Sequence, residues 1–261
     1  MGIEIDLKQH ARPVTLPRSL PVPPAGLDEG EPLEILQWAA RSVPRLSVAS
    51  SFQSSGLVIL HMLREIRPDV PVLFLETGFH FQETLMFKDR IRMMWDLDVV
   101  DLRGLHRSPK QQSVMYGPGL YRFDPDKCCH INKVEPLQMA LEYFEAWISG
   151  LRRDQSASRA KVPAVETQEL PSGKTVLKIH PLATWNKADV DRYLEKHDIP
   201  THPLLEKGYR SIGCWPCTRP VEGTDDDERA GRWANTEKDE CGIHTWGRAG
   251  GGAPLETEAE E

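Results

Sequence analysis

Four of the five cysteines in this chain of 261 residues form two close pairs. Cys128 and Cys129 are adjacent, and Cys214 and Cys217 stand in the sequence C-W-P-C. A C-x-x-C spacing is common among metal ligands because one short turn directs both sulfurs at a common point. Adjacent side chains diverge on a regular backbone, which suits the separate irons of a [4Fe–4S] cluster better than one small ion. Spacing alone leaves zinc and the cluster as comparable alternatives, and two unrelated pairs of buried thiols as a third.

The fifth cysteine, Cys241, lies apart in the sequence ECGIH, where we expect an exposed thiol outside any cluster. Such a thiol suits a nucleophile, and His244 and the upstream arginines would favour its thiolate form. The alternative is an incidental surface cysteine. An odd and small number of cysteines also argues against a disulfide scaffold.

Cationic residues gather in short stretches that could bind an anion. Arginine forms forked hydrogen bonds that match phosphate and sulfate oxygens. Alone, such a run more often covers a solvated face. The candidates are Lys133, Arg152, Arg153, Arg159, Arg229 and Arg232.

Strands and helices are predicted to alternate along most of the chain. Strands are expected at 45–52, 70–77, 97–102, 146–151 and 175–182, and helices at 56–66, 81–95, 131–144 and 184–198. A loop is expected at 103–127. This order predicts the α/β class, with a single doubly wound and mainly parallel sheet. After Pro200 the pattern fades into an irregular C-terminal extension.

Two predicted loops follow the carboxyl ends of the first two strands, where sheets of this kind bind ligands. The segment SSFQSSG (50–56) offers hydroxyls and free N–H groups at a helix N-terminus, where an anion is favoured. It lacks the lysine and the glycine spacing of a Walker A loop. The segment LETG (75–78) ends the second strand similarly. On residue type alone, each is more often an ordinary turn.

Composition predicts a globular chain in four parts. These are a loosely attached proline-rich arm (1–30), an α/β domain (31–212), a segment with the C-x-x-C pair and a mobile cysteine-bearing tail (213–248), and a disordered acidic tail (249–261). No apolar run approaches the roughly 18–20 residues of a membrane helix, and the N-terminus lacks the apolar core of a secretory signal. We therefore expect a cytoplasmic protein without a membrane partner. A formal charge of −7 gives no indication of nucleic-acid binding.

Several motifs together resemble the assimilatory adenylylsulfate (APS) reductases, the iron–sulfur branch of the APS/PAPS reductase family. In order, they are SSFQ, LETG, the double cysteine with Lys133, GLRRDQS, GCWPCTRP, ERAGRW and ECGIH. The resemblance runs from about residue 45 to residue 246. It implies an adenine nucleotide alpha-hydrolase-like fold and the reduction of APS to sulfite with release of AMP. It also implies thioredoxin or a similar dithiol protein as the electron donor.

The resemblance implies a role for each candidate residue. A [4Fe–4S] cluster would be ligated by Cys128, Cys129, Cys214 and Cys217, and Cys241 would be the nucleophile. The adenosine part of APS would contact Ser51, Phe52, Gln53, Leu75, Glu76, Thr77 and Gly78. The phosphosulfate would lie among Lys133, Arg229, Arg232 and His244, near Arg152, Arg153 and Arg159. Glu76 replaces the aspartate that is usual in this loop, and the length of the arginine loop varies among relatives.

The implied reaction has two steps. The Cys241 thiolate attacks the sulfuryl group of APS and AMP leaves; thioredoxin then expels sulfite from the resulting S-sulfocysteine. A PAPS reductase is the first alternative, although that branch generally lacks the two cysteine pairs. A tRNA-thiolating enzyme would need a Ser-Gly-Gly-x-Asp-Ser loop, which is absent, and a zinc-stabilised adenylate-binding module is the non-enzymatic alternative. The sequence leaves open whether the chain forms a homo-oligomer.

Overall fold

A computed structural model describes residues 19–104, 108–221, 228–233, 238 and 240–246. This part of the chain contains a six-stranded sheet with the order β3-β2-β1-β4-β6-β5. The strands are β1 (Leu46–Ala49), β2 (Val72–Leu75), β3 (Val99–Leu102), β4 (Ala146–Ile148), β5 (Val165–Glu169) and β6 (Thr175–Ile179). All neighbours pair in parallel except β5, which is antiparallel to β6. The predicted α/β class with a mainly parallel sheet is confirmed.

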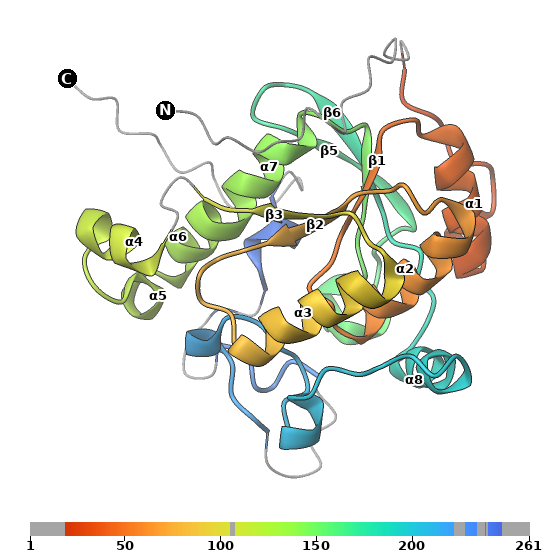
Figure 1. The fold of residues 1–261 in the computed structure, drawn as a ribbon. Helices are drawn as coiled ribbons and strands as arrows, with labels where there is room; N and C mark the ends of the chain where they lie inside the picture. The colour runs from red at the N-terminus through yellow and green to blue at the C-terminus, as the bar shows by residue number, and fades with distance from the viewer. Residues whose placement is uncertain (1–18, 105–107, 222–227, 234–237, 239, 247–261) are drawn as a thin grey trace.

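Helices cover both faces of the sheet (Figure 1). The longer ones are α1 (Pro32–Ser42), α2 (Ser54–Ile66), α3 (Gln82–Trp95), α7 (Glu135–Leu141) and α8 (Lys187–Lys196). In Figure 1, α7 lies on one side of β2 and β3, and α2 and α3 lie on the other. Because β1 lies between β2 and β4, the chain winds outward in both directions from this point. The loops at the carboxyl ends of β1 and β4 therefore diverge, which opens a crevice there.

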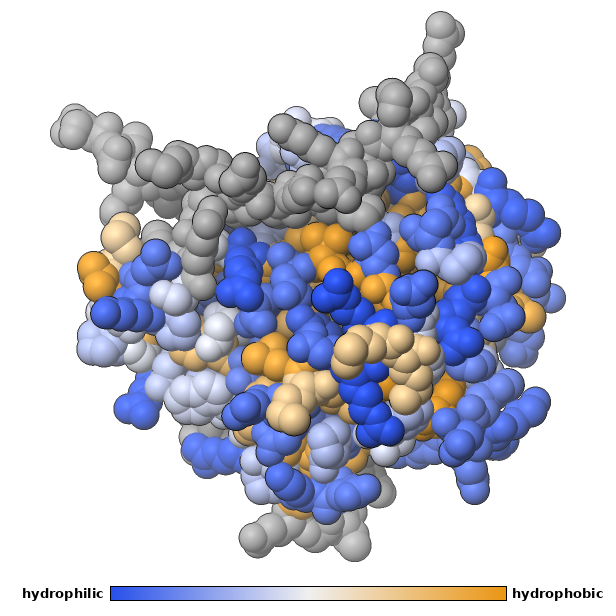
Figure 2. Space-filling view, viewed as in Figure 1, coloured by the Kyte–Doolittle hydropathy of each residue, from blue (hydrophilic) through white to orange (hydrophobic). Residues whose placement is uncertain are grey.

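Two hydrophobic clusters hold these layers together. The larger one packs α1 and α2 against the sheet around Val48, Leu57 and Ile59, which are almost fully buried. The smaller one surrounds Trp147 on the opposite face, where Ile243 and Trp246 of the C-terminal segment also pack. The face shown in Figure 2 is mostly hydrophilic, with hydrophobic residues scattered between polar ones. Among the residues described, every helix is too short or too polar to span a lipid bilayer.

Several elements differ from the sequence prediction. Helix α1, which was not predicted, begins at Pro32 with a capping box formed by Glu31 and Glu34. The predicted loop at 103–127 contains α4 (Pro109–Tyr116) and α5 (Leu120–Phe123). The predicted helix at 131–144 is interrupted: α6 (Pro125–Cys129) continues into a π-helical turn (His130–Val134) before α7. The capping box predicted for Asn186 and Asp189 is present at the start of α8.

Residues 19–30 are attached more closely than a loose arm. Leu27 is buried in the larger cluster, and Asp28 and Glu29 pair with Arg153 at 2.7 Å and 2.8 Å. These contacts fix the end of the arm to the loop after β4. Residues 1–18 of the arm, and the whole acidic tail at 249–261, lie outside the described residues, so those parts of the prediction stay predictions.

Strand β5 was missed because its sequence, VETQE, is almost entirely polar. The structure provides partners for these polar groups. Glu166 lies 3.1 Å from Nζ of Lys178 on β6 and 3.2 Å from Nε2 of His180, the residue that follows β6; both of those side chains are fully buried. Although burial opposes ionisation, the hydrogen bond with His180 and the charge of Lys178 lower the pKa of Glu166 to about 2.

Replacing Glu166 with glutamine should lower the free energy of unfolding by about 3 kcal/mol at pH 7, because the buried Lys178 would lose the carboxylate it contacts. The pKa of Glu166 is lower in the folded state than its ordinary 4.5. Wild-type protein should therefore lose this stability as the pH falls from 4.5 toward 2, and the variant should lack that part of the acid dependence.

Urea unfolding at several pH values measures both effects. Glu169→Gln is the matched control, since Glu169 is an exposed carboxylate on the same strand. Equal losses in the two variants would contradict the role given to Glu166.

Candidate active site

A cavity of about 840 Å³ opens at the carboxyl ends of β1, β2 and β4, at the point where the strand order reverses. It brings together most of the candidate residues named from the sequence. Those that line it are Ser51, Gln53, Leu75, Lys133, Arg152, Arg159, Cys214, Arg229, Arg232, Cys241 and His244. The crevice expected for a doubly wound sheet is therefore the place where the predicted residues meet.

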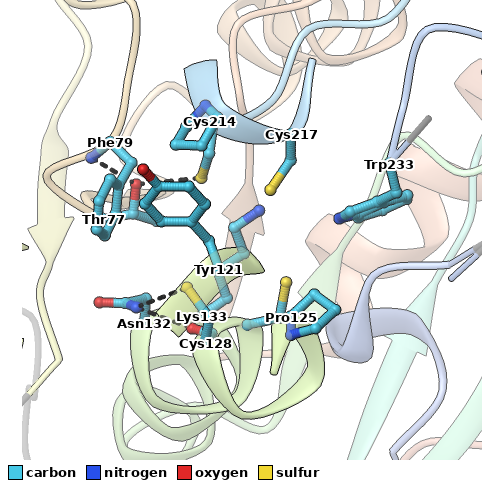
Figure 3. Close-up of a pocket in the computed structure, with 12 residues that line it drawn as sticks. Thr77, Phe79, Tyr121, Pro125, Cys128, Asn132, Lys133, Cys214, Cys217 and Trp233 are labelled. Carbon is cyan, nitrogen blue, oxygen red and sulfur yellow. Dashed lines mark hydrogen bonds between the residues drawn. The ribbon is translucent and has the colours of Figure 1, made fainter. Parts of the chain in front are cut away.

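A second, narrow cavity is lined by all four paired cysteines (Figure 3). Cys128 and Cys129 end α6, whereas Cys214 directly precedes a short 3-10 turn (Trp215–Cys217) that ends at Cys217. Figure 3 shows the sulfurs of Cys128, Cys214 and Cys217 directed into the same space. Lys133 and Cys214 line both cavities, so the two spaces adjoin.

The π-helical turn (His130–Val134) explains how adjacent cysteines and Lys133 can serve one site. A π turn is wider than an α turn and changes the directions of the side chains that follow it. Lys133 lies within this turn and faces the cysteines. Gly242 of the C-terminal segment packs against the same turn, where a Cβ would lie only 2.9 Å from Val134 Cγ2. The glycine thus allows the segment to approach closely.

Buried amides contact one of the cysteine sulfurs, which the sequence analysis did not predict. Gln112 Nε2 lies 3.7 Å from Cys128 Sγ, and Asn132 Nδ2 lies 3.6 Å from the same sulfur. Asn132 also donates to Gln112 Oε1 at 2.8 Å, which orients both amides. Thr77 Oγ1 lies 3.4 Å from Cys214 Sγ. Neutral donors of this kind stabilise negative sulfur without adding a charge.

The four paired cysteines form the possible ligand set of a metal centre. Four thiols face one narrow space whose walls include Phe79, Tyr121, Pro125 and Trp233. An apolar wall and four thiolate ligands are what a [4Fe–4S] cluster requires. The residues present thus fit the four-thiolate ligand set of such a cluster.

Lys133 lies among sulfur atoms from both cavities. Burial opposes its charge, but the nearby sulfurs of Cys214, Cys241 and Cys129 raise the pKa of Lys133 above its ordinary value. The ammonium is therefore present at neutral pH. It lies where it can act both on the paired cysteines and on an anion in the larger cavity.

Cys241 is buried, with 8% of its surface exposed, so the expectation of an exposed thiol is wrong for this arrangement. Ile243 and Trp246 pack into the smaller cluster and bring the thiol into the cavity. With the Cys129 thiol protonated, its hydrogen bond holds the pKa of Cys241 well below its usual range against the effect of burial, and the Lys133 ammonium lowers this pKa further. If Cys129 binds iron as a thiolate, that hydrogen bond is lost, and Lys133, Arg232 and the backbone of Ile243 are the groups that still favour the Cys241 thiolate.

His244 follows Cys241 in a 3-10 turn (Gly242–His244) and lines the same cavity. Burial, reinforced by the charges of Arg159 and Lys178, lowers the pKa of His244 well below its ordinary value. The imidazole is therefore neutral at pH 7. It can donate or accept a hydrogen bond beside the cavity, but it adds no positive charge.

The neighbouring arginines Arg152 and Arg153 contact different residues. Arg152 contacts Ser55 Oγ at 2.6 Å and pairs with Asp154 and Glu228. Arg153 lines neither cavity, because it points toward Asp28 and Glu29. This position does not support the prediction that Arg153 contacts substrate. The backbone of Arg152 is extended, so the side chains of Arg152 and Arg153 point in different directions.

A second group of arginines comes from the C-terminal segment and the loop after β4. Arg159 and Arg229 both pair with Glu240, at 2.7 Å and 3.0 Å. Arg232 packs its guanidinium over the ring of Trp233 and against Gly213, where any side chain would collide with it. Among the residues that the structure describes, neither Lys133 nor Arg232 has a carboxylate within ion-pair distance.

The two loops contribute less than the sequence predicted. Phe52 adopts a φ of 56° and is fully buried against Phe74, so it belongs to the core and not to the cavity. Glu76 Oε1 accepts a hydrogen bond from the N–H of Gly78, and both residues stabilise the turn without lining the larger cavity. The prediction that these three residues contact adenosine is not supported by their positions. Thr77 faces the narrow cavity instead.

Comparison with known proteins identifies the family. Residues 45–220 match the model of the phosphoadenosine phosphosulfate reductase domain. An adenosine 5'-phosphosulfate reductase from Streptomyces coelicolor is 44% identical over 220 residues, covering 84% of this chain and 90% of the relative. The chain belongs to the phosphoadenosine phosphosulfate reductase family.

Other members of this reductase family differ in their named substrate. A phosphoadenosine 5'-phosphosulfate reductase from Gloeobacter violaceus is 42% identical, covering 82% of this chain and 88% of the relative. The crystal structure of phosphoadenylyl-sulfate (PAPS) reductase from Candida auris has a TM-score of 0.65 and 30% identity, covering 74% of this chain and 93% of that one. Candida glabrata FMN adenylyltransferase covers 80% of this chain and 76% of its own, and with 16% identity and a TM-score of 0.54 it shares the fold alone.

Gln53 joins the first loop to the segment that carries the C-x-x-C pair. Its Nε2 donates to the carbonyl of Ile212 and its Oε1 accepts from the N–H of Ile212, both at 2.7 Å. Gln53→Leu should speed hydrogen exchange at the Ile212 amide at least about tenfold, since each lost hydrogen bond of a buried group costs about 1–3 kcal/mol. Exchange measured by NMR or mass spectrometry tests this.

Ser51→Ala is the control: Ser51 Oγ accepts a hydrogen bond from the Gln53 amide and, among the residues described, makes none to Ile212, so the Ile212 amide should stay protected. Unchanged exchange in Gln53→Leu would show that the two segments are held together by other contacts.

Proposed function

We propose that this chain reduces adenylylsulfate (APS) to sulfite and AMP, with electrons from thioredoxin or a similar dithiol protein. Family membership supports an oxidoreductase that acts on a sulfur group. The observation that carries the proposal is the position of the Cys241 thiol, which lies in the nucleotide-sized cavity beside Lys133 and Arg232. A reactive sulfur is thus placed against two cations at the crevice where this fold binds ligands.

The first step forms a sulfur–sulfur bond. The Cys241 thiolate attacks the sulfur of the bound sulfuryl group, the sulfur–oxygen bond to AMP breaks, and AMP leaves with that electron pair. The product on the enzyme is an S-sulfocysteine. In the second step a thiolate of the dithiol partner attacks Cys241 Sγ and expels sulfite; the partner's second thiol then restores Cys241. The dithiol supplies the two electrons that reduce sulfate sulfur to sulfite.

Electrostatics limits the first step, because an anionic nucleophile must approach an anionic group. Lys133 and Arg232 offset this repulsion and stabilise the charge that develops on the leaving phosphate. Their contribution is large in a cavity from which the protein excludes much of the water, since charges interact more strongly there. The neutral His244 is positioned to hydrogen-bond to substrate oxygen without competing with these cations.

The four paired cysteines would hold a [4Fe–4S] cluster in the narrow cavity. When bound, the cluster would supply a polarisable charged group beside Lys133 and would join α6 to the C-terminal segment. The dithiol already accounts for both electrons of the reaction. We therefore assign the cluster a structural and electrostatic role.

A PAPS reductase is the second candidate, and relatives with that name support it. The two cysteine pairs favour APS, because the PAPS-reducing branch of the family that the sequence resembles generally lacks them. The two activities share every chemical step and differ only in the 3'-phosphate of the substrate.

Kinetic comparison of APS and PAPS tests the function. Anaerobic protein with thioredoxin should form sulfite with a kcat/KM for APS that is at least about a hundredfold higher than for PAPS, as expected when one buried charged group is left unmatched.

Cys241→Ser should abolish sulfite formation while APS still binds, measured by calorimetry. Normal turnover in this variant would end the nucleophile assignment, and a preference for PAPS would select the second candidate.

Iron and labile sulfide analysis tests the cluster. Protein isolated without oxygen should contain about four irons and four sulfides, and Cys128→Ser and Cys217→Ser should each lose most of both. Cys241→Ser is the matched control and should retain them, because Cys241 is not a ligand in this assignment. Full iron content in the ligand variants would contradict it.

A further inference from the structure

Glu240 makes an unusual set of contacts for the residue that directly precedes the nucleophile. Its side chain is 9% exposed. The two carboxylate oxygens accept from Arg159 Nε and Nη2, both at 2.7 Å, and Oε1 also accepts from Arg229 Nη2 at 3.0 Å. The fourth hydrogen bond to this carboxylate comes from the backbone N–H of Cys241, which donates to Oε1 at 2.8 Å.

These contacts join three parts of the chain at one buried carboxylate. Arg159 belongs to the loop after β4, Arg229 belongs to the C-terminal segment, and Cys241 carries the thiol. A forked arginine–carboxylate pair is directional, because two parallel hydrogen bonds define the orientation of both groups. Although burial opposes its ionisation, the hydrogen bonds from Arg159 keep the pKa of Glu240 below its ordinary value, so the carboxylate is charged.

Because these contacts pair some of the cations with carboxylates, they determine which positive side chains can bind a substrate anion. Arg159 and Arg229 share the charge of Glu240, and Arg152 is paired with Asp154 and Glu228. Lys133 and Arg232 line the cavity with no carboxylate at ion-pair distance within the described ranges. The arginine loop therefore holds the C-terminal segment, while the other two cations face the anion.

We propose that Glu240 is a positioning residue for Cys241: its carboxylate fastens the nucleophile-bearing segment to Arg159 and Arg229. Closing the segment then places the thiol in the cavity, and opening it requires these ion pairs to break. The assignment of substrate rests on the proposed function, whereas the docking of the segment does not.

Hydrogen exchange tests the docking without any turnover. In anaerobic full-length protein, Glu240→Gln should speed exchange of a peptide covering residues 240–246 at least about tenfold, as expected for the loss of charge-assisted hydrogen bonds. Glu240→Asp keeps the charge on a shorter side chain and should lie between wild type and Glu240→Gln. Glu206→Gln removes an exposed carboxylate elsewhere and is the control for net charge.

A double-mutant cycle tests whether Arg159 is the partner. Arg159→Met should speed exchange in the same peptide, and adding Glu240→Gln should have little further effect, because both changes remove one interaction. Additive effects, or exchange in Glu240→Gln equal to wild type, would overturn the proposal. Circular dichroism and melting temperature show whether each variant is folded.

Steady-state kinetics separate positioning from binding. Glu240→Gln should lower kcat about tenfold and leave the KM for APS unchanged or lower, since the thiol is misplaced but the substrate-facing cations are intact. A tenfold rise in KM with normal kcat would show that Glu240 acts in substrate binding, contrary to the proposal. If wild-type protein forms no sulfite from APS, the proposed function fails, and the exchange experiment still decides the docking.

Discussion

The ammonium of Lys133 and the sulfur atoms around it form the interaction on which both cavities depend. A cation at this depth is tolerated only where negative groups balance the cost of removing it from water. Cys129, Cys214 and Cys241 supply that balance, and they come from three separate segments of the chain. The backbone must therefore bring α6, the C-x-x-C turn and the C-terminal segment to one point. The π-helical turn, Gly242 and Gly213 are the local features that allow this close approach.

Around this centre the protein keeps opposite charges in separate places. Carboxylates pair with four of the candidate arginines, Arg152, Arg153, Arg159 and Arg229, and three of these four lie in the loop after β4 and hold other segments in place. Lys133 and Arg232 are left to face the larger cavity, where a neutral His244 stands beside them. In this way the site attracts an anion without assembling so many cations that they would repel one another and weaken the fold.

The sequence predicted the parallel sheet correctly, and the five cysteines that it singled out line the two adjoining cavities, because both depend on local patterns. Buried apolar runs define the parallel strands, and thiol spacing reports a shared ligand. Strand β5 was missed because its polar side chains find partners in Lys178 of β6 and in His180, which follows β6, and no local pattern reveals these contacts.

Single residues also show that local sequence patterns do not reveal contacts between distant parts of the chain. Arg152 and Arg153 are neighbours of identical type, but an extended backbone turns them to opposite sides, and only one reaches the cavity. Phe52 belongs to the core because the chain turns there with a positive φ. Glu240 was overlooked because an acidic residue beside a nucleophile has no meaning until its arginine partners are seen in three dimensions.

The burial of Cys241 also bears on how such a thiolate survives in a cell. A sulfur that is easily deprotonated reacts with peroxide and with stray disulfides in proportion to its accessibility. With its thiol enclosed by the C-terminal segment, the resting molecule is shielded from both kinds of damage. Under the proposed mechanism the thiol would be exposed only while a dithiol partner reaches the sulfur, so the closure that aligns the attack would also limit oxidation of Cys241.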